Sequence, residues 1–217
     1  MAEQEQPKPR KRRSWLRVVT ILLGSIGVLI LAGGLYWNWK FHSHSCAKGL
    51  GLSLRMYAND HGGWLPHGAH SPEASMSLIY SNDPLSLQWW APGKHLPKSV
   101  VNDALAKDGI LSPASCGWHY VEGLREEDPP QLAIAWDKVI GLGHNGNRIS
   151  GLQHEVVMLD GSSRLILRSE WSRFVVQQKA MLWETISKRT SNDPPIRWSD
   201  EDTFGPNKFP PPVPLKR

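Results

Sequence analysis

The stretch from Val18 to Trp37 constrains the fold more than any other part of the chain. Its twenty residues, VVTILLGSIGVLILAGGLYW, carry no charge, and their polar side chains are limited to Thr20, Ser25 and Tyr36. A helix of this length measures about 30 Å at a rise of about 1.5 Å per residue, which matches the hydrocarbon core of a bilayer. A soluble helix of the same length would turn a polar face to water. The stretch therefore predicts a transmembrane helix.

The residues on either side of this stretch predict its orientation. Six basic residues precede it: Lys8, Arg10, Lys11, Arg12, Arg13 and Arg17. Basic residues beside a membrane span stay on the cytoplasmic side, and aromatic side chains such as Trp15 and Trp39 gather at the membrane–water boundaries. We therefore expect a basic cytoplasmic head (1–17), an anchor in the inner (cytoplasmic) membrane (18–39), and an extracytoplasmic remainder. The lipid bilayer is the predicted partner of the anchor.

Two other interpretations of the N-terminus are weaker. A cleaved signal peptide has an apolar core of about 7–15 residues followed by a small-residue cleavage site. Here the core is longer, and bulky Leu35, Tyr36 and Trp37 follow Gly33 and Gly34. A basic arm that binds nucleic acid would not explain the apolar span beside it, and much of the net charge of +5 comes from the head. We expect an uncleaved signal anchor and no nucleic-acid partner.

The remainder predicts one α+β domain over residues 40–190. Cys46, Leu50, Leu54 and Tyr57 keep helical spacing, which predicts a helix over 41–58 that continues the membrane helix outward as one rod. Two short helices are expected at 74–80 and 100–107. Strands are expected at 117–121, 132–136, 155–159 and 164–168, and the last two flank a turn at Asp160-Gly161 that predicts a hairpin with a four-residue loop.

A final helix is predicted from Glu170 to about Arg189, with Ser169 as its N-cap. Its inner stripe consists of Trp171, Phe174, Val175, Gln178, Leu182 and Ile186. Residues 191–217 are rich in proline and polar side chains, so we expect an extended, mobile tail or a strap over the domain.

Three residues just after the span form a candidate metal site. His42, His44 and Cys46 alternate as H-x-H-x-C, and on a strand they would share one face and could bind zinc or copper. On the helix predicted here, residues two apart point about 200° away from one another, which separates the ligands. The metal site is therefore the weaker interpretation, and no cofactor is predicted.

The two cysteines, Cys46 and Cys116, both lie on the predicted outer side, where disulfides persist. A bond between them would close a long loop and stabilise the fold by about 4 kcal/mol in the chain-entropy model. They are therefore a candidate disulfide. Asp160 suits a tight turn, where aspartate bonds to nearby backbone. The sequence contains no G-x-S-x-G, Walker loop or dinucleotide fingerprint, so we predict no catalytic residues and a non-enzymatic protein.

Several stretches together resemble a known family. They occur in this order: C-A-K-G-L-G-L-S-L-R-M-Y-A-N-D-H-G-G-W-L-P (46–66), L-S-P-A-S-C-G-W-H-Y-V-E-G-L (111–124), D-P-P-Q-L-A-I-A-W-D-K (128–138), G-H-N-G-N (143–147) and V-V-M-L-D-G (156–161). The arrangement resembles the pseudopilin-like membrane proteins of bacterial type II secretion. The resemblance implies a pilin-like fold, a long helix laid on a small antiparallel sheet, with His144, Asp160 and Gly161 as the family signature. It also implies envelope or secretion-system proteins as partners.

The N-terminus departs from that family. Pilins carry a cleavable leader that ends in glycine and a glutamate near the start of the span, whereas Val18–Trp37 contains no acid and Arg17 directly precedes it. We therefore expect a single-pass, pseudopilin-like envelope protein that binds or scaffolds and does not polymerise. The alternative is a periplasmic metal- or redox-active protein that uses His42, His44 and Cys46.

Overall fold

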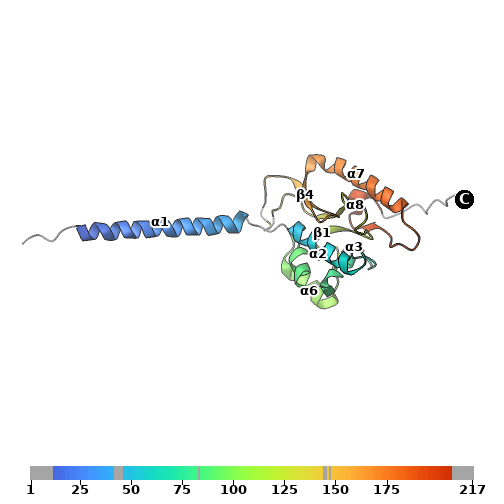
Figure 1. Ribbon diagram of the computed structural model, residues 1–217, viewed down its shortest axis with the longest axis horizontal. Coiled ribbons are helices and arrows are strands. Elements are labelled where there is room, and N and C mark those ends of the chain that lie inside the picture. Colours follow the sequence, from blue (N-terminus) through green and yellow to red (C-terminus); the bar gives the residue numbers. More distant parts are fainter. Residues whose placement is uncertain (1–11, 42–45, 83, 144–145, 147, 207–217) are drawn as a thin grey trace, which may run out of the picture. The chain divides into compact units, whose positions relative to one another are not determined.

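The computed structural model describes residues 12–41, 46–82, 84–143, 146 and 148–206 (Figure 1). The chain divides into two compact units, Met1–Ser43 and His44–Arg217. The first contains one helix, α1, among its described residues, and the second contains a mixed α+β domain. The predicted α+β class is confirmed.

Helix α1 (Arg12–Phe41) has an apolar central segment, which carries no charged side chain. Its segment Val18–Leu35 has a mean hydropathy of 2.4, and none of that segment is buried by the rest of the protein. The Ser25 hydroxyl donates to the Ile21 carbonyl oxygen at 2.8 Å, so this polar side chain is satisfied within the helix. Among the described residues, α1 is the one helix long and apolar enough to cross a membrane. The predicted apolar N-terminal helix is therefore confirmed.

Helix α2 (Cys46–Asp60) begins the domain and packs through the predicted stripe, because Leu50, Leu54 and Tyr57 are buried. Glycines in a helix weaken it, and here they permit close packing. A Cβ on Gly49 would lie 2.4 Å from the Trp90 ring, and one on Gly51 would lie 3.0 Å from Val157 Cγ1. The predicted continuation of the membrane helix into α2 as one rod stays a prediction, because residues 42–45 lie outside the described residues.

The domain is built on a five-stranded antiparallel sheet in the order β4-β3-β2-β1-β5. The strands are β1 (Trp118–Glu122), β2 (Ala133–Asp137), β3 (Gln153–Met158), β4 (Ser163–Leu167) and β5 (Arg197–Trp198). The first four form a meander and match the predicted strands to within two residues. The predicted hairpin is also confirmed, since residues 159–162 connect β3 to β4.

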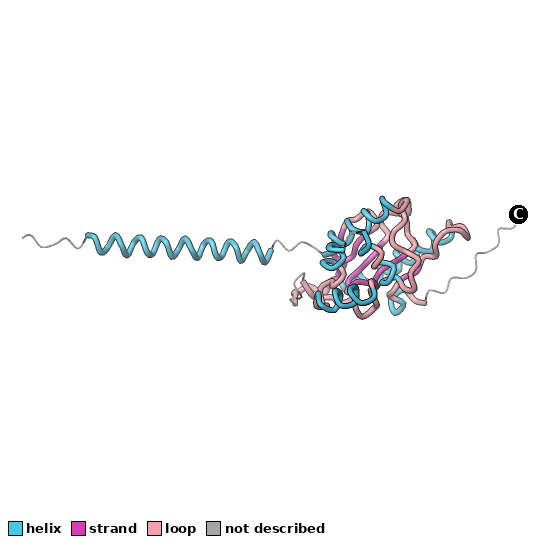
Figure 2. The backbone as a smooth tube through the Cα atoms, turned by 90° about the horizontal axis from the view of Figure 1, so that it is seen from below, coloured by secondary structure: helices cyan, strands magenta, loops and turns pink. Residues whose placement is uncertain are grey.

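Helices cover both faces of the sheet, with α2 and α7 (Arg168–Ser187) on opposite sides (Figure 1). The strands run through the centre of the domain between these layers (Figure 2). Gly51 of α2 approaches Val157 on one face, and Trp171 of α7 lies against Trp136 on the other, with ring centroids 6.4 Å apart. Helices α4 (Ile79–Asn82) and α5 (Pro84–Trp90) pack on α2, while α3 (Pro72–Met76) packs on β1 and α6 (Lys98–Asp108) packs on α5.

The core is organised around three fully buried aromatic side chains, each of which has its polar atom bonded. Trp118 Nε1 donates to the Trp90 carbonyl at 2.6 Å, and the Tyr120 hydroxyl donates to the Pro66 carbonyl at 3.0 Å. Trp136 Nε1 donates to Asp200 Oδ2 at 3.0 Å. Because buried polar atoms are expensive to leave unpaired, these bonds fix the rings in single orientations. Two of the three acceptors are backbone atoms of loops and of α5, so the rings also hold those segments to the sheet.

The helical predictions need two corrections. The segment predicted as one helix over 74–80 forms two, α3 and α4, and Ser71 caps α3 by accepting from the Ala74 N–H at 3.2 Å. Helix α7 starts directly after β4 with Leu167 at the N-cap and no side-chain cap, so the assignment of Ser169 as N-cap was wrong. The inner stripe of α7 is confirmed, since all six predicted side chains are buried or packed on the core.

The C-terminal segment is more ordered than the sequence predicts. Residues Arg197–Trp198 form β5 at the edge of the sheet, and α8 (Glu201–Phe204) follows it. Ile196, Trp198 and Phe204 are buried in the core. The boundary predicted at residue 190 is therefore too early, because the domain continues at least to Phe204. Residues 207–217 lie outside the described residues.

Candidate functional site

Most residues of the candidate metal site lie outside the described residues. His42, His44 and the side chain of Cys46 are not described, and neither is His144 of the family signature. The described residues contain no group of three or more His, Cys, Asp or Glu that could hold a metal ion. A site at His42, His44 and Cys46 therefore stays a prediction.

Cys116 is buried and carries a free thiol in this structure. Its Sγ lies 3.4 Å from the Trp118 carbonyl and 4.0 Å from Met76 Sδ, within the core. Burial raises the pKa of the thiol to about 11, so at neutral pH the group stays protonated and is a poor nucleophile. The disulfide with Cys46 stays a prediction, since only one of the two side chains is described.

Asp160 and Gly161 form the tip of the β3–β4 hairpin. The Asp160 side chain accepts the Ser162 N–H at 2.8 Å, and hydrogen bonding from Ser162 lowers the pKa of this carboxyl. Gly161 has a φ of +81°, which favours glycine. Arg55 of α2 donates to the Asp160 carbonyl at 3.0 Å and so ties the tip to the helix. The contacts of Asp160 and Gly161 are those of a turn, and the prediction of a tight turn is confirmed.

A buried cluster of charged side chains lies where β2 ends. Lys94 Nζ is 3.0 Å from Asp137 Oδ2 and 3.1 Å from Glu155 Oε2, and all three side chains are almost wholly buried. His154 Nδ1 is 3.1 Å from Asp137 Oδ1, and its ring stacks on Trp171 at 3.8 Å. Burial acts to lower the pKa of Lys94, but the two carboxylates outweigh it and hold that pKa above its usual value. Lys94 therefore stays charged.

This cluster links elements that are distant in the sequence. Asp137 ends β2, Glu155 and His154 lie in β3, and Lys94 comes from the loop after α5. A second ion pair, of which only the acid is fully buried, lies one residue along, where Lys138 Nζ is 2.9 Å from Glu73 Oε1. Buried ion pairs add little net stability, but loss of one partner strands the other charge. The cluster therefore acts as a fastening between the α5–α6 loop and the sheet.

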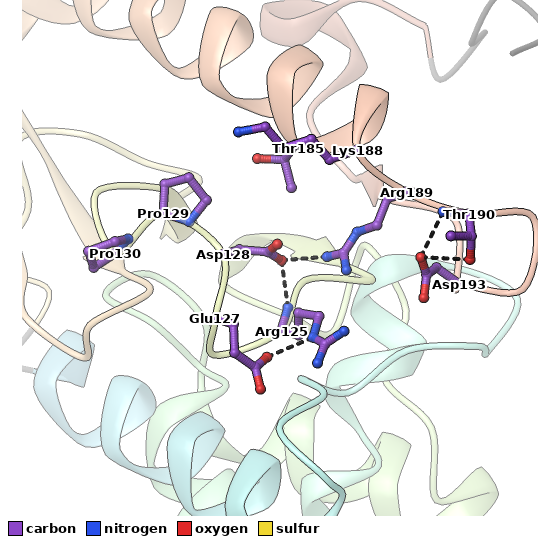
Figure 3. Close-up of a pocket in the computed structure, with 10 residues that line it drawn as sticks. All are labelled: Arg125, Glu127, Asp128, Pro129, Pro130, Thr185, Lys188, Arg189, Thr190 and Asp193. Carbon is purple, nitrogen blue, oxygen red and sulfur yellow. Dashed lines mark hydrogen bonds and ion pairs between the residues drawn. The ribbon is translucent and has the colours of Figure 1, made fainter. Parts of the chain in front are cut away.

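One cleft lies between the β1–β2 loop and the C-terminal end of α7 (Figure 3). It has a volume of about 530 Å³ and is lined by three basic and three acidic side chains: Arg125, Lys188, Arg189, Glu127, Asp128 and Asp193. Most of these charges bind one another or nearby backbone. Arg189 pairs with Asp128, and Arg125 Nε donates to Glu127 Oε2 at 2.6 Å.

Trp64 contacts both arginines of this cleft. The guanidinium carbons of Arg125 and Arg189 lie 5.0 and 4.9 Å from the Trp64 ring centroid, within the range of cation–π attraction. Hydrogen bonding from Arg125 also lowers the pKa of Glu127. Both arginines already pair with acidic side chains of this chain. Their contacts join α7 to the β1–β2 loop and leave little unpaired charge for a ligand.

A second cleft, of about 510 Å³, brings Ser199, His119 and Asp200 together. Ser199 Oγ lies 3.4 Å from His119 Nδ1, and His119 Nε2 lies 3.9 Å from Asp200 Oδ2. Burial lowers the pKa of His119, against the opposing effect of Asp200. These are the residue types of a hydrolytic triad, which no motif in the sequence indicated because His119 lies 80 residues before Ser199.

The contacts of this trio fit a structural role better than a catalytic one. A working base and its carboxylate approach to about 2.6–3.2 Å, whereas the imidazole–carboxylate distance here is 3.9 Å. The Asp200 oxygens accept from Trp136 Nε1 at 3.0 Å and from the Thr203 N–H at 3.1 Å, and Ser199 Oγ accepts from the Tyr120 N–H at 2.9 Å. The trio therefore fastens the C-terminal segment to β1.

Neither the Lys94–Asp137–Glu155 cluster nor the Ser199–His119–Asp200 trio was predicted from the sequence. One signal was available for the first: Asp137 is a single acid at the end of the apolar run A-I-A-W-D, within a stretch that carries the family resemblance. Its partner Lys94 lies 43 residues earlier, in a loop with no pattern of its own.

Comparison with protein-family models, with curated proteins and with solved structures found no match.

Proposed function

We propose that this protein is a single-pass, membrane-anchored envelope protein whose extracytoplasmic domain binds or scaffolds other envelope proteins. The observation that carries the proposal is the apolar surface of α1. Its Val18–Leu35 segment is apolar around the whole helix and has no burial within the protein. A helix that is apolar all round needs an apolar surrounding, and a bilayer is one of matching thickness. The basic residues before it support a cytoplasmic N-terminus.

A pilin-like organisation is part of the same proposal. Helix α2 lies on the face of an antiparallel meander and touches β3 through Gly51 and Val157. This agrees with a helix laid on a small sheet, which the resemblance implies. The domain adds elements of its own after the meander, namely α7, β5 and α8. The span lacks the glutamate that pilins carry near its start. We therefore expect a role in secretion that does not involve polymerisation.

The arrangement of charge supports binding over catalysis. In both clefts, several of the described acidic and basic groups bond to other side chains of the domain or to its backbone. A general base or nucleophile works through contacts with a substrate, and its neighbours position it for that purpose. Here the contacts join secondary-structure elements. We therefore place the function on the outer surfaces of the domain.

Mass spectrometry of the membrane-extracted protein tests the proposal. We expect the full-length mass of 24.4 kDa, in a membrane fraction that resists alkaline carbonate extraction. Release by carbonate would contradict the anchor. An N-terminus trimmed or methylated between Arg13 and Ser25 would instead show that the chain enters the prepilin pathway.

The metal- or redox-active alternative rests on His42, His44 and Cys46. Metal analysis of the purified full-length protein distinguishes it from the scaffold. Stoichiometric copper or zinc that is lost on His44→Ala would favour the alternative, and its absence would favour the scaffold.

A further inference from the structure

Strand β4 forms an open border of the sheet. The sheet order ends at β4, and no described strand pairs with its outer side. The other border, β5, is only two residues long, and its Trp198 is buried. Strand β4 is longer and exposes two apolar side chains, Leu165 at 57% and Leu167 at 47%. Its five residues contain no proline, and its register with β3 has no bulge. Natural proteins usually protect such an edge.

The pairing with β3 shows which backbone groups of β4 face outward. The Met158 N–H donates to the Ser162 carbonyl and the Arg168 N–H donates to the Leu152 carbonyl, both at 2.8 Å. Hydrogen-bonded pairs alternate along an antiparallel ladder, so Arg164 and Ile166 bond to β3. The N–H and C=O groups of Ser163 and Leu165, and the N–H of Leu167, therefore point away from the sheet. The Leu167 carbonyl lies at the N-cap of α7.

This edge is complementary to itself. When two copies of β4 meet antiparallel with Leu165 opposite Leu165, the outward groups of the two strands face each other. The two Leu165 residues exchange two hydrogen bonds, and each Leu167 N–H meets the Ser163 carbonyl of the other copy. Arg164 then lies opposite Ile166, so no like charges oppose each other. The exposed leucines on the α2 side lie together at the centre.

We propose that β4 is a homodimerisation edge, where two copies of this chain join their sheets antiparallel about a two-fold axis at Leu165. Isologous pairing of this kind is the commonest way in which identical subunits associate. The hairpin at Asp160-Gly161 and the start of α7 at Arg168 limit the edge to five residues, and a second copy brings an edge of equal length. The inference concerns the domain and holds whether or not α1 spans a membrane.

Register-specific disulfide trapping of the full-length protein in detergent tests the geometry. A Cys46→Ser background removes one native thiol, and Cys116 is buried. With Leu165→Cys, the two thiols would lie on Cα atoms about 5.5 Å apart, within disulfide range. With Leu167→Cys alone, the Cα atoms would be about 14 Å apart along the strands.

We expect the oxidised dimer yield of Leu165→Cys to exceed that of Leu167→Cys by about 10-fold or more, because only the first pair meets disulfide geometry. A mixture of Ser163→Cys and Leu167→Cys protein should form mixed dimers. Equal yields from Leu165→Cys and Leu167→Cys, or no dimer from Leu165→Cys, would overturn the proposal.

A matched pair of lysine substitutions tests the interaction without cysteines. Leu165→Lys places a charge at the centre of the edge, and Leu52→Lys makes the same change on the outer side of α2, where Leu52 is 62% exposed. Sedimentation in detergent should give a dimer for wild type and Leu52→Lys, and at least a tenfold weaker dimer for Leu165→Lys. Circular dichroism verifies that both variants are folded. A monomeric wild-type chain, or a dimer equally strong in Leu165→Lys, would contradict the proposal.

Discussion

Helix α1 exposes its apolar side chains, whereas the α+β domain buries several charged side chains. In α1 the large apolar side chains of the Val18–Leu35 segment are exposed. In the domain, Lys94, Asp137 and Glu155 are buried. An apolar group without apolar neighbours and a charge without water are both unfavourable in a soluble protein. The apolar side chains of α1 therefore need an apolar surrounding, and the buried charges of the domain need groups of opposite charge beside them.

The domain supplies its own partners and α1 does not. Lys94 lies within about 3 Å of both carboxylates, so the buried charges compensate one another. The apolar surface of α1 has no counterpart in the described part of the chain, and a bilayer would provide one. The difference teaches that apolar content alone does not identify a core: the place of each side chain relative to its neighbours does.

The largest expected effect comes from emptying the buried cluster. Lys94→Ala leaves Asp137 and Glu155 buried without their cation, and breaking a buried pair in this way costs about 3–5 kcal/mol. We expect urea unfolding of the full-length protein in detergent, followed by tryptophan fluorescence, to show a loss of this size.

Lys107→Ala is the matched control. Lys107 also faces a carboxylate, that of Asp108 at 3.8 Å, but both side chains are exposed. A surface pair contributes about 0–1 kcal/mol. Equal losses for the two variants would show that burial of the charges around Lys94 does not matter.

A charge placed in α1 should have the next largest effect. Ile26→Arg puts a cation near the middle of the span, where insertion experiments assign arginine a cost of about 2.5–3.5 kcal/mol. We expect a lower fraction of the protein to resist carbonate extraction. If α1 were a soluble helix, its membrane retention would not depend on this residue.

The same substitution on α7 separates the two environments. Val176 is exposed on α7, and Val176→Arg should change the free energy of unfolding by no more than about 0.5 kcal/mol, as is usual at such surface positions. Membrane retention should be unchanged. A large effect at Val176 would mean that this surface of α7 is covered by another molecule.

A smaller effect separates backbone strain from charge burial. Gly161→Ala forces a side chain onto a φ of +81° beside Arg55 Cδ, 2.8 Å from the new Cβ. Left-handed backbone costs a non-glycine residue about 1–2 kcal/mol. Gly62→Ala has a φ of +62° and open space around it, so it reports the strain alone. Urea unfolding should show the larger loss for Gly161→Ala, and the reverse order would refute the packing of the hairpin tip on Arg55.

The sequence predicts the regular elements because their signals are local. The runs that became β1 to β4 are apolar and bounded by turn residues, and the inner stripe of α7 recurs with helical spacing. The segment after residue 190 lacks such a period. Its apolar residues Ile196, Trp198 and Phe204 are separated by polar residues, so nothing local indicates that all three are buried.

The charged contacts could not be predicted because their partners are distant in the chain. Lys94 and Asp137 are 43 residues apart, and Trp136 and Asp200 are 64 apart. Only the folded sheet brings them together. A single acid at the end of an apolar strand, as at Asp137, indicates that a partner exists but not which residue it is.

The most direct test of the membrane-anchored topology is a pair of reporter fusions. A reporter that is active only outside the cytoplasm should be active when fused after Arg217 and inactive when fused near Ser14. A reporter that is active only in the cytoplasm should give the opposite pattern. The basic head before the apolar segment is the physical reason why we propose this orientation. Cytoplasmic activity of the Arg217 fusion would contradict the account.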